Sequence, residues 1–230
     1  MLKLYYHPLS PAARRVWITL LEKALPFELI ELRLDGDQFQ PEFLAINPFH
    51  HVPALVDEDL HLFESLAILD YLETAHPIPA MLPTERRSLA LVRMVEMVTV
   101  NELAPAMRPL VEHDLGMAVV DSLKLEQAHR KTRRVLQFFE QQLDDHPYFG
   151  GKYLTLADVV AGVSVPRLAT LGFSFAEFPR LQAWCDRLQA RPSWQETEPS
   201  PELLTKFAAE IAERRNHAGP PQQMVEDTNP

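Results

Sequence analysis

The chain has 230 residues, 47% of them hydrophobic and 23% charged, which is typical of one large or two small globular domains. Its net charge of −10 argues against nucleic acid as a partner and gives no attraction to an anionic membrane. No apolar run reaches the roughly 18 residues of a membrane span, and the N-terminus lacks a signal-peptide core. The single cysteine, Cys185, excludes an internal disulfide and fits a reducing compartment. We therefore expect a soluble, cytoplasmic protein.

The N-terminal part of the chain predicts a strand, a helix and a second strand. The apolar segment Leu2 to Tyr6 predicts a buried strand, and the alternating segment Phe27 to Leu32 predicts another. Between them, Ser10 and Pro11 have the features of a helix start, with serine as the N-cap and proline at the first helical position. This strand–helix–strand order implies a right-handed crossover and a parallel pair of strands.

A hairpin and a further helix are expected next. A short helix is predicted near residues 41–45, within a polar connection. The apolar runs 52–56 and 60–63 flank turn-forming residues and predict an antiparallel hairpin. Ser65 would be the N-cap of a helix over residues 65–75. The expected element order of this half is therefore βαβ–α–ββα.

The proline-rich segment 76–79 marks a change in composition, and no later segment has a strand pattern. We expect an α/β domain over residues 1–76, a linker over 77–84 and an all-helical domain over 85–215. Residues 216–230 are polar and lack periodicity, which predicts a disordered tail.

Apolar stripes predict the helices of the second half, over residues 85–116, 125–143, 159–165, 178–190 and 201–215. Pro105 and Pro109 predict kinks or breaks near the end of the first of these helices. Thr155 and Asp158 form a capping-box variant, with aspartate in place of the usual glutamate, and predict the start of a core helix.

Two helix starts could bind a charged small molecule. Glu64 and Ser65 stand where a strand meets a helix, so open N–H groups attract an anion and the carboxylate attracts an ammonium. Ser10 follows the first strand, at the edge where such folds bind ligands. A thiolate placed there would meet a hydroxyl and open N–H groups, which both lower a thiol pKa. From the Ser-Pro pair alone, a plain N-cap is the simpler interpretation of Ser10.

The sequence resembles the cytosolic glutathione transferases. V-P-A-L at residues 52–55, a turn, and F-E-S-x-A-I at residues 63–68 resemble their glutathione-binding half. The context K-L-Y-x-x-P-L-S-P-x-x-R-R-V around Ser10 is similar to serine-type members of the phi and theta kind. The resemblance covers roughly residues 2–215. It implies a thioredoxin-like N-terminal domain followed by an all-helical C-terminal domain.

The resemblance assigns the catalytic serine to Ser10. Tyr5 and Tyr6 lie within the predicted strand, so a tyrosine-type mechanism is the weaker assignment. No cysteine stands at this point of the sequence, which argues against chemistry that needs a thiol nucleophile.

Glutathione contacts also follow from the resemblance. Pro53 corresponds to the family's cis-proline, and Val52 would offer its backbone to the cysteinyl part of glutathione. Glu64 and Ser65 match the acidic-serine pair for the γ-glutamyl group. His51 occupies the place where relatives often have glutamine, so its contact with glutathione differs in chemistry.

One departure from the family pattern concerns the glycine carboxylate of glutathione. Gln38 and Phe39 stand where the phi class carries a His-Lys pair, so a cation is missing there. Gln38 can still donate a hydrogen bond, and His50, in place of a common glycine, is an alternative partner.

The remaining candidates have structural alternatives. Leu9, Met97 and Asn101 are expected in an apolar pocket for the second substrate, although core packing is the simpler interpretation of the methionine. At least one of Arg14 and Arg15 should be exposed, and Arg14 could face the site.

Metal binding and cysteine chemistry are not expected. His50, His51 and His61 alternate on a hairpin without the Cys or Glu ligands of a typical metal site. Cys185 lies between apolar residues on a predicted helix and is expected in the core.

These patterns predict a glutathione transferase that transfers the thiolate of glutathione to a hydrophobic electrophile or reduces a hydroperoxide. A homodimer is implied, with the helix 65–75 near the interface. The alternative is a non-catalytic protein with the same fold that binds a ligand or a partner. A dehalogenase or isomerase is a third interpretation, since these use the same thiolate.

Overall fold

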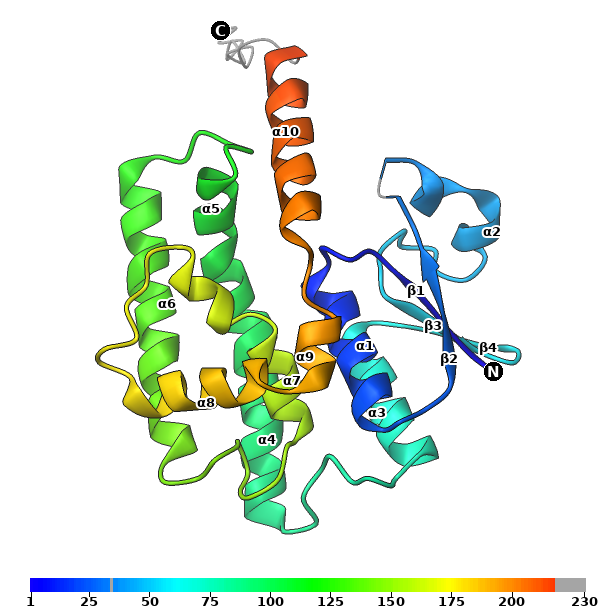
Figure 1. The fold of residues 1–230 in the computed structure, drawn as a ribbon, viewed down its shortest axis with the longest axis vertical. Helices are drawn as coiled ribbons and strands as arrows, with labels where there is room; N and C mark the ends of the chain where they lie inside the picture. Colours follow the sequence, from blue (N-terminus) through cyan, green and yellow to red (C-terminus); the bar gives the residue numbers. More distant parts are fainter. Residues whose placement is uncertain (34, 218–230) are drawn as a thin grey trace, which may run out of the picture.

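A four-stranded sheet with the order β2-β1-β3-β4 forms the N-terminal half (Figure 1). The computed structural model describes residues 1–33 and 35–217. The strands are β1 (Leu2–Tyr6), β2 (Phe27–Glu31), β3 (Ala54–Asp57) and β4 (Leu60–Phe63). Strand β1 pairs with β2 in parallel and with β3 antiparallel, and β3 and β4 form the hairpin. The predicted parallel pair and the predicted hairpin are both confirmed.

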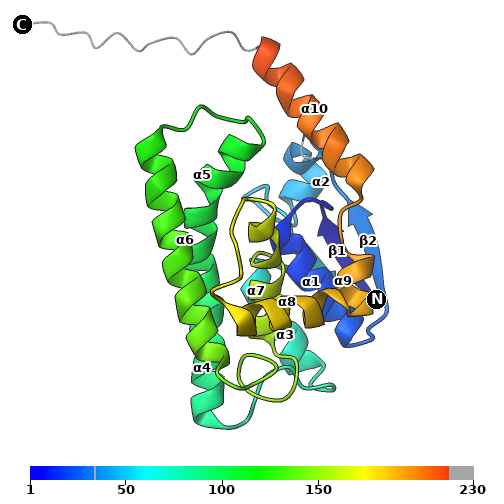
Figure 2. The same ribbon diagram turned by 60° about the vertical axis from the view of Figure 1, so that its left-hand side comes forward.

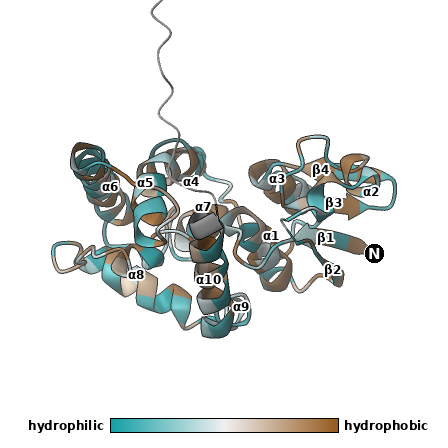
Figure 3. Cartoon of the chain, turned by 90° about the horizontal axis from the view of Figure 1, so that it is seen from above, coloured by the Kyte–Doolittle hydropathy of each residue, from teal (hydrophilic) through white to brown (hydrophobic). Residues whose placement is uncertain are grey.

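Helices cover both faces of this sheet. Helices α1 (Pro11–Glu22) and α3 (Ser65–Ala75) lie between the sheet and the second half of the chain (Figures 1 and 3). The short helix α2 (Pro41–Leu44) packs on the opposite face, where the rings of Tyr5 and Phe43 lie 5.7 Å apart. Because side chains alternate along a strand, β1 buries its leucines under α1 and α3 and turns Tyr5 toward α2.

The described residues of the second half are helical apart from turns and one isolated bridge. Its α-helices are α4 (Arg86–Val98), α5 (Ala104–Asp114), α6 (Ser122–Leu143), α7 (Leu156–Gly162), α8 (Pro179–Gln189), α9 (Pro192–Glu196) and α10 (Pro201–His217). Helix α7 is buried along its whole length. Around it, the ring centroids of Phe139 and Phe149 lie 5.5 Å apart, and those of Phe149 and Trp184 lie 5.2 Å apart.

The long helix predicted over residues 85–116 is interrupted at Thr99–Leu103, where a π-helical turn separates α4 from α5. Pro105 has no N–H to donate to the carbonyl of Asn101, so a regular α-helix could not make this hydrogen bond. A wider, π-helical turn at this point is compatible with the missing donor. The break expected at Pro109 is absent, because α5 continues through this residue.

Two further differences concern the C-terminal end of the chain. The short helix α9 was not predicted, because Arg191 to Glu196 has too few residues for a periodic pattern. Helix α10 rises away from the body beside the carboxyl end of β1 (Figure 2) and continues to His217. The tail predicted from residue 216 is therefore helical at its first two positions, and residues 218–230 lie outside the described residues.

None of the described helices combines the length and the apolar character needed to span a bilayer.

Candidate functional site

A cavity of about 490 Å³ lies at the carboxyl end of β1, where α1 begins. Its lining brings together residues from the start of α1, from the segment before α2 and from the loop before β3. They are Ser10, Gln38, Phe39, His50, His51 and Val52. Four of the residues predicted to bind or activate glutathione thus share one cavity, although they come from three separate segments of the chain.

Ser10 is the N-cap of α1, and its hydroxyl oxygen accepts a hydrogen bond from the backbone N–H of Ala13 at 3.2 Å. Its own N–H donates to the carbonyl of His7 at 2.9 Å, which closes the turn between β1 and α1. A hydroxyl that accepts with its oxygen still has its hydrogen to donate. Capping and donation to a ligand are therefore compatible roles for Ser10.

His7 organises this turn, and the sequence interpretation did not include it. Its Nδ1 accepts from the backbone N–H of Leu9 at 3.2 Å, which requires an unprotonated Nδ1. Burial lowers the pKa of His7, although the charges of Glu31 and Glu210 act in the opposite direction. The proline after His7 was the only sequence signal of a turn here.

Aromatic rings surround the part of the cavity near α2. Phe39 is 59% exposed and meets the ring of His50 edge-on, with centroids 5.1 Å apart. The ring of His51 stacks on that of His50 at 6.1 Å. Gln38 is buried, and its Oε1 accepts from the N–H of Gly36 at 3.1 Å. Of the described residues that line this cavity, none is lysine or arginine.

His50 has two unusual features. Its φ of 51° lies in the left-handed region, which a side chain disfavours and glycine does not. Its Nδ1 is buried and has no hydrogen-bond partner among the described residues. A residue held in a strained conformation with an unused polar atom suggests a role in binding.

The loop before β3 is held by Asn47, which the sequence interpretation missed. Its buried side chain donates from Nδ2 to the carbonyl of His51 at 2.7 Å and accepts from the N–H of Phe49 at 3.0 Å. The Val52–Pro53 peptide bond is cis, as the resemblance implied. The dipeptide Asn-Pro was a usable turn signal for this loop.

The start of α3 corrects the assignment of Ser65. The N-cap of α3 is Glu64, with a φ of 68° and no capping hydrogen bond from its side chain, and Ser65 is the first helical residue. The left-handed turn at Glu64 places Ser65 one position inside the helix, where its hydroxyl accepts from Nη1 of Arg15 at 3.3 Å. Neither Glu64 nor Ser65 lines the cavity described above.

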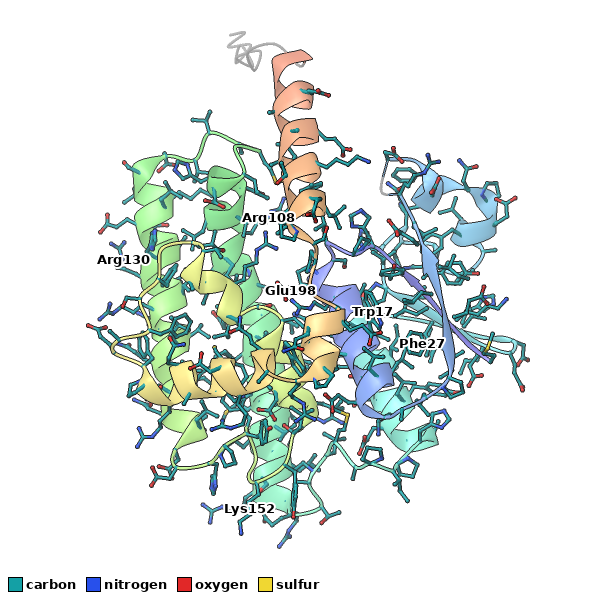
Figure 4. The ribbon with its side chains drawn as sticks, viewed as in Figure 1. Trp17, Phe27, Arg108, Arg130, Lys152 and Glu198 are labelled. Atoms are coloured by element: carbon teal, nitrogen blue, oxygen red, sulfur yellow. The ribbon has the colours of Figure 1, made fainter. Side chains whose placement is uncertain are left out.

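The expectation that at least one of Arg14 and Arg15 is exposed was wrong, because neither side chain is exposed. The side chain of Arg14 is 12% exposed, and Arg15 is 6% exposed. Arg14 donates to the carbonyl of Trp194 at 3.0 Å and to Oγ1 of Thr197 at 3.1 Å, and it pairs with Glu198. Glu198 lies between α9 and α10, next to α1 (Figure 4). Arg14 therefore ties α1 to the C-terminal helices and does not face the cavity.

The residues predicted for a second substrate are not brought into this cavity. Leu9 is half-buried next to Ser10, Met97 on α4 is 44% exposed, and Asn101 is exposed in the π-helical turn. Their assignment stays a prediction.

The structure also describes the cysteine and the potential metal ligands. Cys185 is buried on α8, and burial raises the pKa of its thiol to about 12, which confirms the expectation of a core cysteine. Among the side chains that the structure describes, in residues 1–33 and 35–213, no three or more of His, Cys, Asp or Glu are grouped so that they could hold a metal ion.

Comparison with known proteins agrees with this geometry. Residues 4–83 match the model of the glutathione S-transferase N-terminal domain, and residues 98–192 match that of the C-terminal domain. A glutathione S-transferase from Hyoscyamus muticus is 33% identical over 209 residues, which cover 84% of this chain and 95% of the relative. The chain belongs to the glutathione S-transferase family. Glutathione S-transferase 3 of Zea mays is 35% identical over 207 residues, covering 85% of this chain and 92% of the relative.

Solved structures of the family share the fold. Glutathione transferase F7 from Populus trichocarpa superimposes with a TM-score of 0.76 at 30% identity, covering 86% of this chain and 97% of that one. A glutathione transferase homologue from Sulfitobacter, solved with bound glutathione, gives a TM-score of 0.71 at 26% identity, covering 85% and 96%. The thioredoxin-like first half and the helical second half are thus those of the glutathione S-transferase fold.

Proposed function

We propose that this protein is a glutathione transferase in which the hydroxyl of Ser10 stabilises the thiolate of bound glutathione. The observation that carries this proposal is the shared cavity of Ser10, Gln38, His51 and Val52 at the carboxyl end of β1. A hydroxyl donor and the N-terminus of α1 both favour negative charge on a sulfur placed there.

Glutathione would extend along the edge of the sheet from α2 to α3. The backbone of Val52 would bind the cysteinyl part, and Glu64 and Ser65 the γ-glutamyl part. Gln38, His50 and His51 would surround the glycine end. Because the described lining of this cavity has no lysine or arginine, we assign the glycine carboxylate to His50, whose buried Nδ1 has no partner.

The chemical step follows from a stabilised thiolate. The glutathione thiol loses its proton to solvent, and the sulfur attacks an electrophilic carbon. A C–S bond forms as the leaving group departs with its electron pair. With a hydroperoxide, the sulfur attacks the terminal oxygen and the O–O bond breaks, so that the alkoxide takes up a proton and leaves as an alcohol. The sulfenic acid formed on glutathione then condenses with a second glutathione to give the disulfide and water. The serine hydroxyl donates a hydrogen bond to the sulfur and is not itself consumed.

We further propose that the hydrophobic electrophile contacts Leu9, Met97 and Asn101, that the protein acts in the cytoplasm, and that it is a homodimer with α3 near the interface. The exposure of Met97 supports the first assignment, because an unpacked methionine adapts to apolar ligands of varied shape.

The test is steady-state conjugation of glutathione to an aryl halide, alongside isothiocyanate and hydroperoxide substrates, with Ser10→Ala. Loss of one hydrogen bond to a charged atom should lower kcat about 10- to 100-fold and leave glutathione binding nearly unchanged. Ser10→Thr keeps a hydroxyl and an N-cap and is the control. A Ser10→Ala enzyme with full activity would remove Ser10 from the mechanism.

A second candidate is a non-catalytic protein with this fold that binds a ligand or a partner. The observation that favours it is that none of the described residues lining the cavity is lysine or arginine. Calorimetry separates the two proposals. Glutathione that fails to bind, together with no turnover of any electrophile, would support the second candidate. Preferential turnover of an organohalide or of a cis–trans isomerisable substrate, in either case without net consumption of glutathione, would identify a dehalogenase or an isomerase.

A further inference from the structure

Arg15 is a buried cation without a counter-charge among the described residues. It lies on α1 and is 6% exposed. Its Nη1 donates to Oγ of Ser65 at 3.3 Å, and its Nε has no hydrogen-bond partner. Among the side chains that the structure describes, no carboxylate pairs with Arg15, and burial alone lowers its pKa to about 10.

Two other cations with buried or half-buried side chains have a carboxylate partner. Lys23 forms an ion pair with Glu73 at 2.6 Å, and Arg191 pairs with Glu22 at 2.6 Å. A buried charge without an opposite charge is strongly unfavourable, so folds rarely retain one that is unused. The isolation of Arg15 therefore indicates an anion that is bound from outside the chain.

The start of α3 is where such an anion would bind. The helix has 11 residues, and its first N–H groups have no side-chain cap. The hydroxyl of Ser65 accepts from Arg15, which has no acceptor to offer in return. The hydrogen of that hydroxyl must therefore donate to another group. The open N–H groups, the hydroxyl hydrogen and the guanidinium charge all favour an anion at this end of α3.

We propose that Arg15 is a positioning residue that, through Ser65, makes the start of α3 selective for the α-carboxylate of a γ-glutamyl group. This inference rests on the proposed function, since glutathione supplies that carboxylate. Arg15 fixes the hydroxyl of Ser65 as a donor toward the carboxylate and provides the counter-charge. The ligand in turn neutralises a charge that the empty protein leaves unpaired.

The proposal predicts different effects on stability and on binding. If Arg15 served only for packing, its replacement would lower stability. Replacement of Arg15 by an apolar side chain of similar length removes an unpaired buried charge, so the thermal midpoint should stay unchanged or rise. Selective binding should fall in the same variant.

The experiment compares two peptides by calorimetry with the full chain. One is glutathione, and the other is γ-aminobutyryl-cysteinylglycine, which lacks only the α-carboxylate. The variants are Arg15→Met and Arg15→Lys, with Arg14→Met as the matched neighbour that contacts α9 and Glu198 instead. The wild type should bind glutathione about 10- to 100-fold more tightly than the analogue. Arg15→Met should reduce this ratio to a few-fold, and Arg15→Lys should restore part of it.

The outcomes are distinct. If Arg15→Met weakens both peptides equally and keeps the wild-type ratio, Arg15 is structural and the inference is overturned. If the wild type binds neither peptide, the proposed function fails and this inference fails with it. Arg14→Met should leave the ratio unchanged, and a loss as large as that of Arg15→Met would also contradict the proposal. If Arg15→Met fails to fold, the expected effect on stability is wrong, and Arg15→Gln, which keeps a donor for Ser65 without the charge, tests the effect on binding.

Discussion

Helices α7 and α3 begin in opposite ways, although both have short polar residues at their start. At α7, Asp158 accepts hydrogen bonds at both carboxylate oxygens. Its donors are the backbone N–H groups of Phe149 at 2.9 Å and Thr155 at 2.7 Å, the hydroxyl of Thr155 at 2.8 Å and the indole of Trp184 at 2.8 Å. Burial raises the pKa of Asp158 to about 6, while these four hydrogen bonds act to lower it. This carboxylate has no capacity left for a ligand.

At α3, by contrast, fewer of the polar groups are satisfied. Glu64 is exposed and makes no capping bond, and the Ser65 hydroxyl accepts from Arg15, which has no counter-charge among the described residues. A closed start of this kind at α7 stabilises the core, whereas the start of α3 has the donors and the charge that the proposals above assign to ligand binding. Under these proposals, a capping residue indicates function only when its partners are left unsatisfied.

The largest effect should come from disrupting the hydrogen bonds of Asp158 at the start of α7. Asp158→Asn replaces an acceptor oxygen with an NH₂ group that faces existing donors, so at least one buried donor loses its partner. We expect the free energy of unfolding to fall by about 2–4 kcal/mol. Urea denaturation measures this change. Asp121→Asn at the exposed N-cap of α6 is the control, because asparagine caps as well as aspartate. Equal stabilities of the two variants would contradict the comparison.

An intermediate effect should come from relieving the backbone strain at Glu64, the N-cap of α3. Glu64→Asn places a residue that tolerates left-handed φ at 68°, so stability should rise by about 0.5–1 kcal/mol. Glutathione affinity should fall about tenfold, since its ammonium loses a carboxylate partner. Glu58→Asn, at a φ of 54° in the β3–β4 turn, is the matched control for strain. It should gain stability without any change in glutathione binding, and parallel losses in both variants would refute the role of Glu64.

The smallest effect is expected at His50. His50→Gly removes the strain of a φ of 51° but also removes the contact with Phe39. Because the two effects oppose each other, the free energy of unfolding should rise by only about 0.5 kcal/mol. Glutathione affinity should decrease a few-fold if His50 binds the glycine carboxylate. Ala24→Gly, at a φ of 50° next to the end of α1, relieves similar strain away from the cavity. Calorimetry that finds identical affinities in both variants would exclude His50 as a ligand residue.

Much of the fold could be predicted from the sequence, because the relevant signals are local. The strand β1, the helix start at Ser10, the hairpin before α3 and the capping box of α7 each depend on a few neighbouring residues. Alternation, capping preference and turn composition act over the same short range. The resemblance added the cis peptide bond at Pro53, which no local pattern would have favoured.

The tertiary structure alone decided which polar groups are satisfied. Arg14 bonds to Trp194 and Thr197, which are 180 and 183 positions away in the chain, so its burial has no local signal. Ser65 became a helical residue because the chain turns at Glu64, and Arg15 reached it from a helix 50 positions earlier. Hydrogen bonds and desolvation depend on atoms brought together by packing. Sequence therefore determined, to within one residue, where the helices of the candidate site begin, and only packing decided which polar groups at their starts are satisfied.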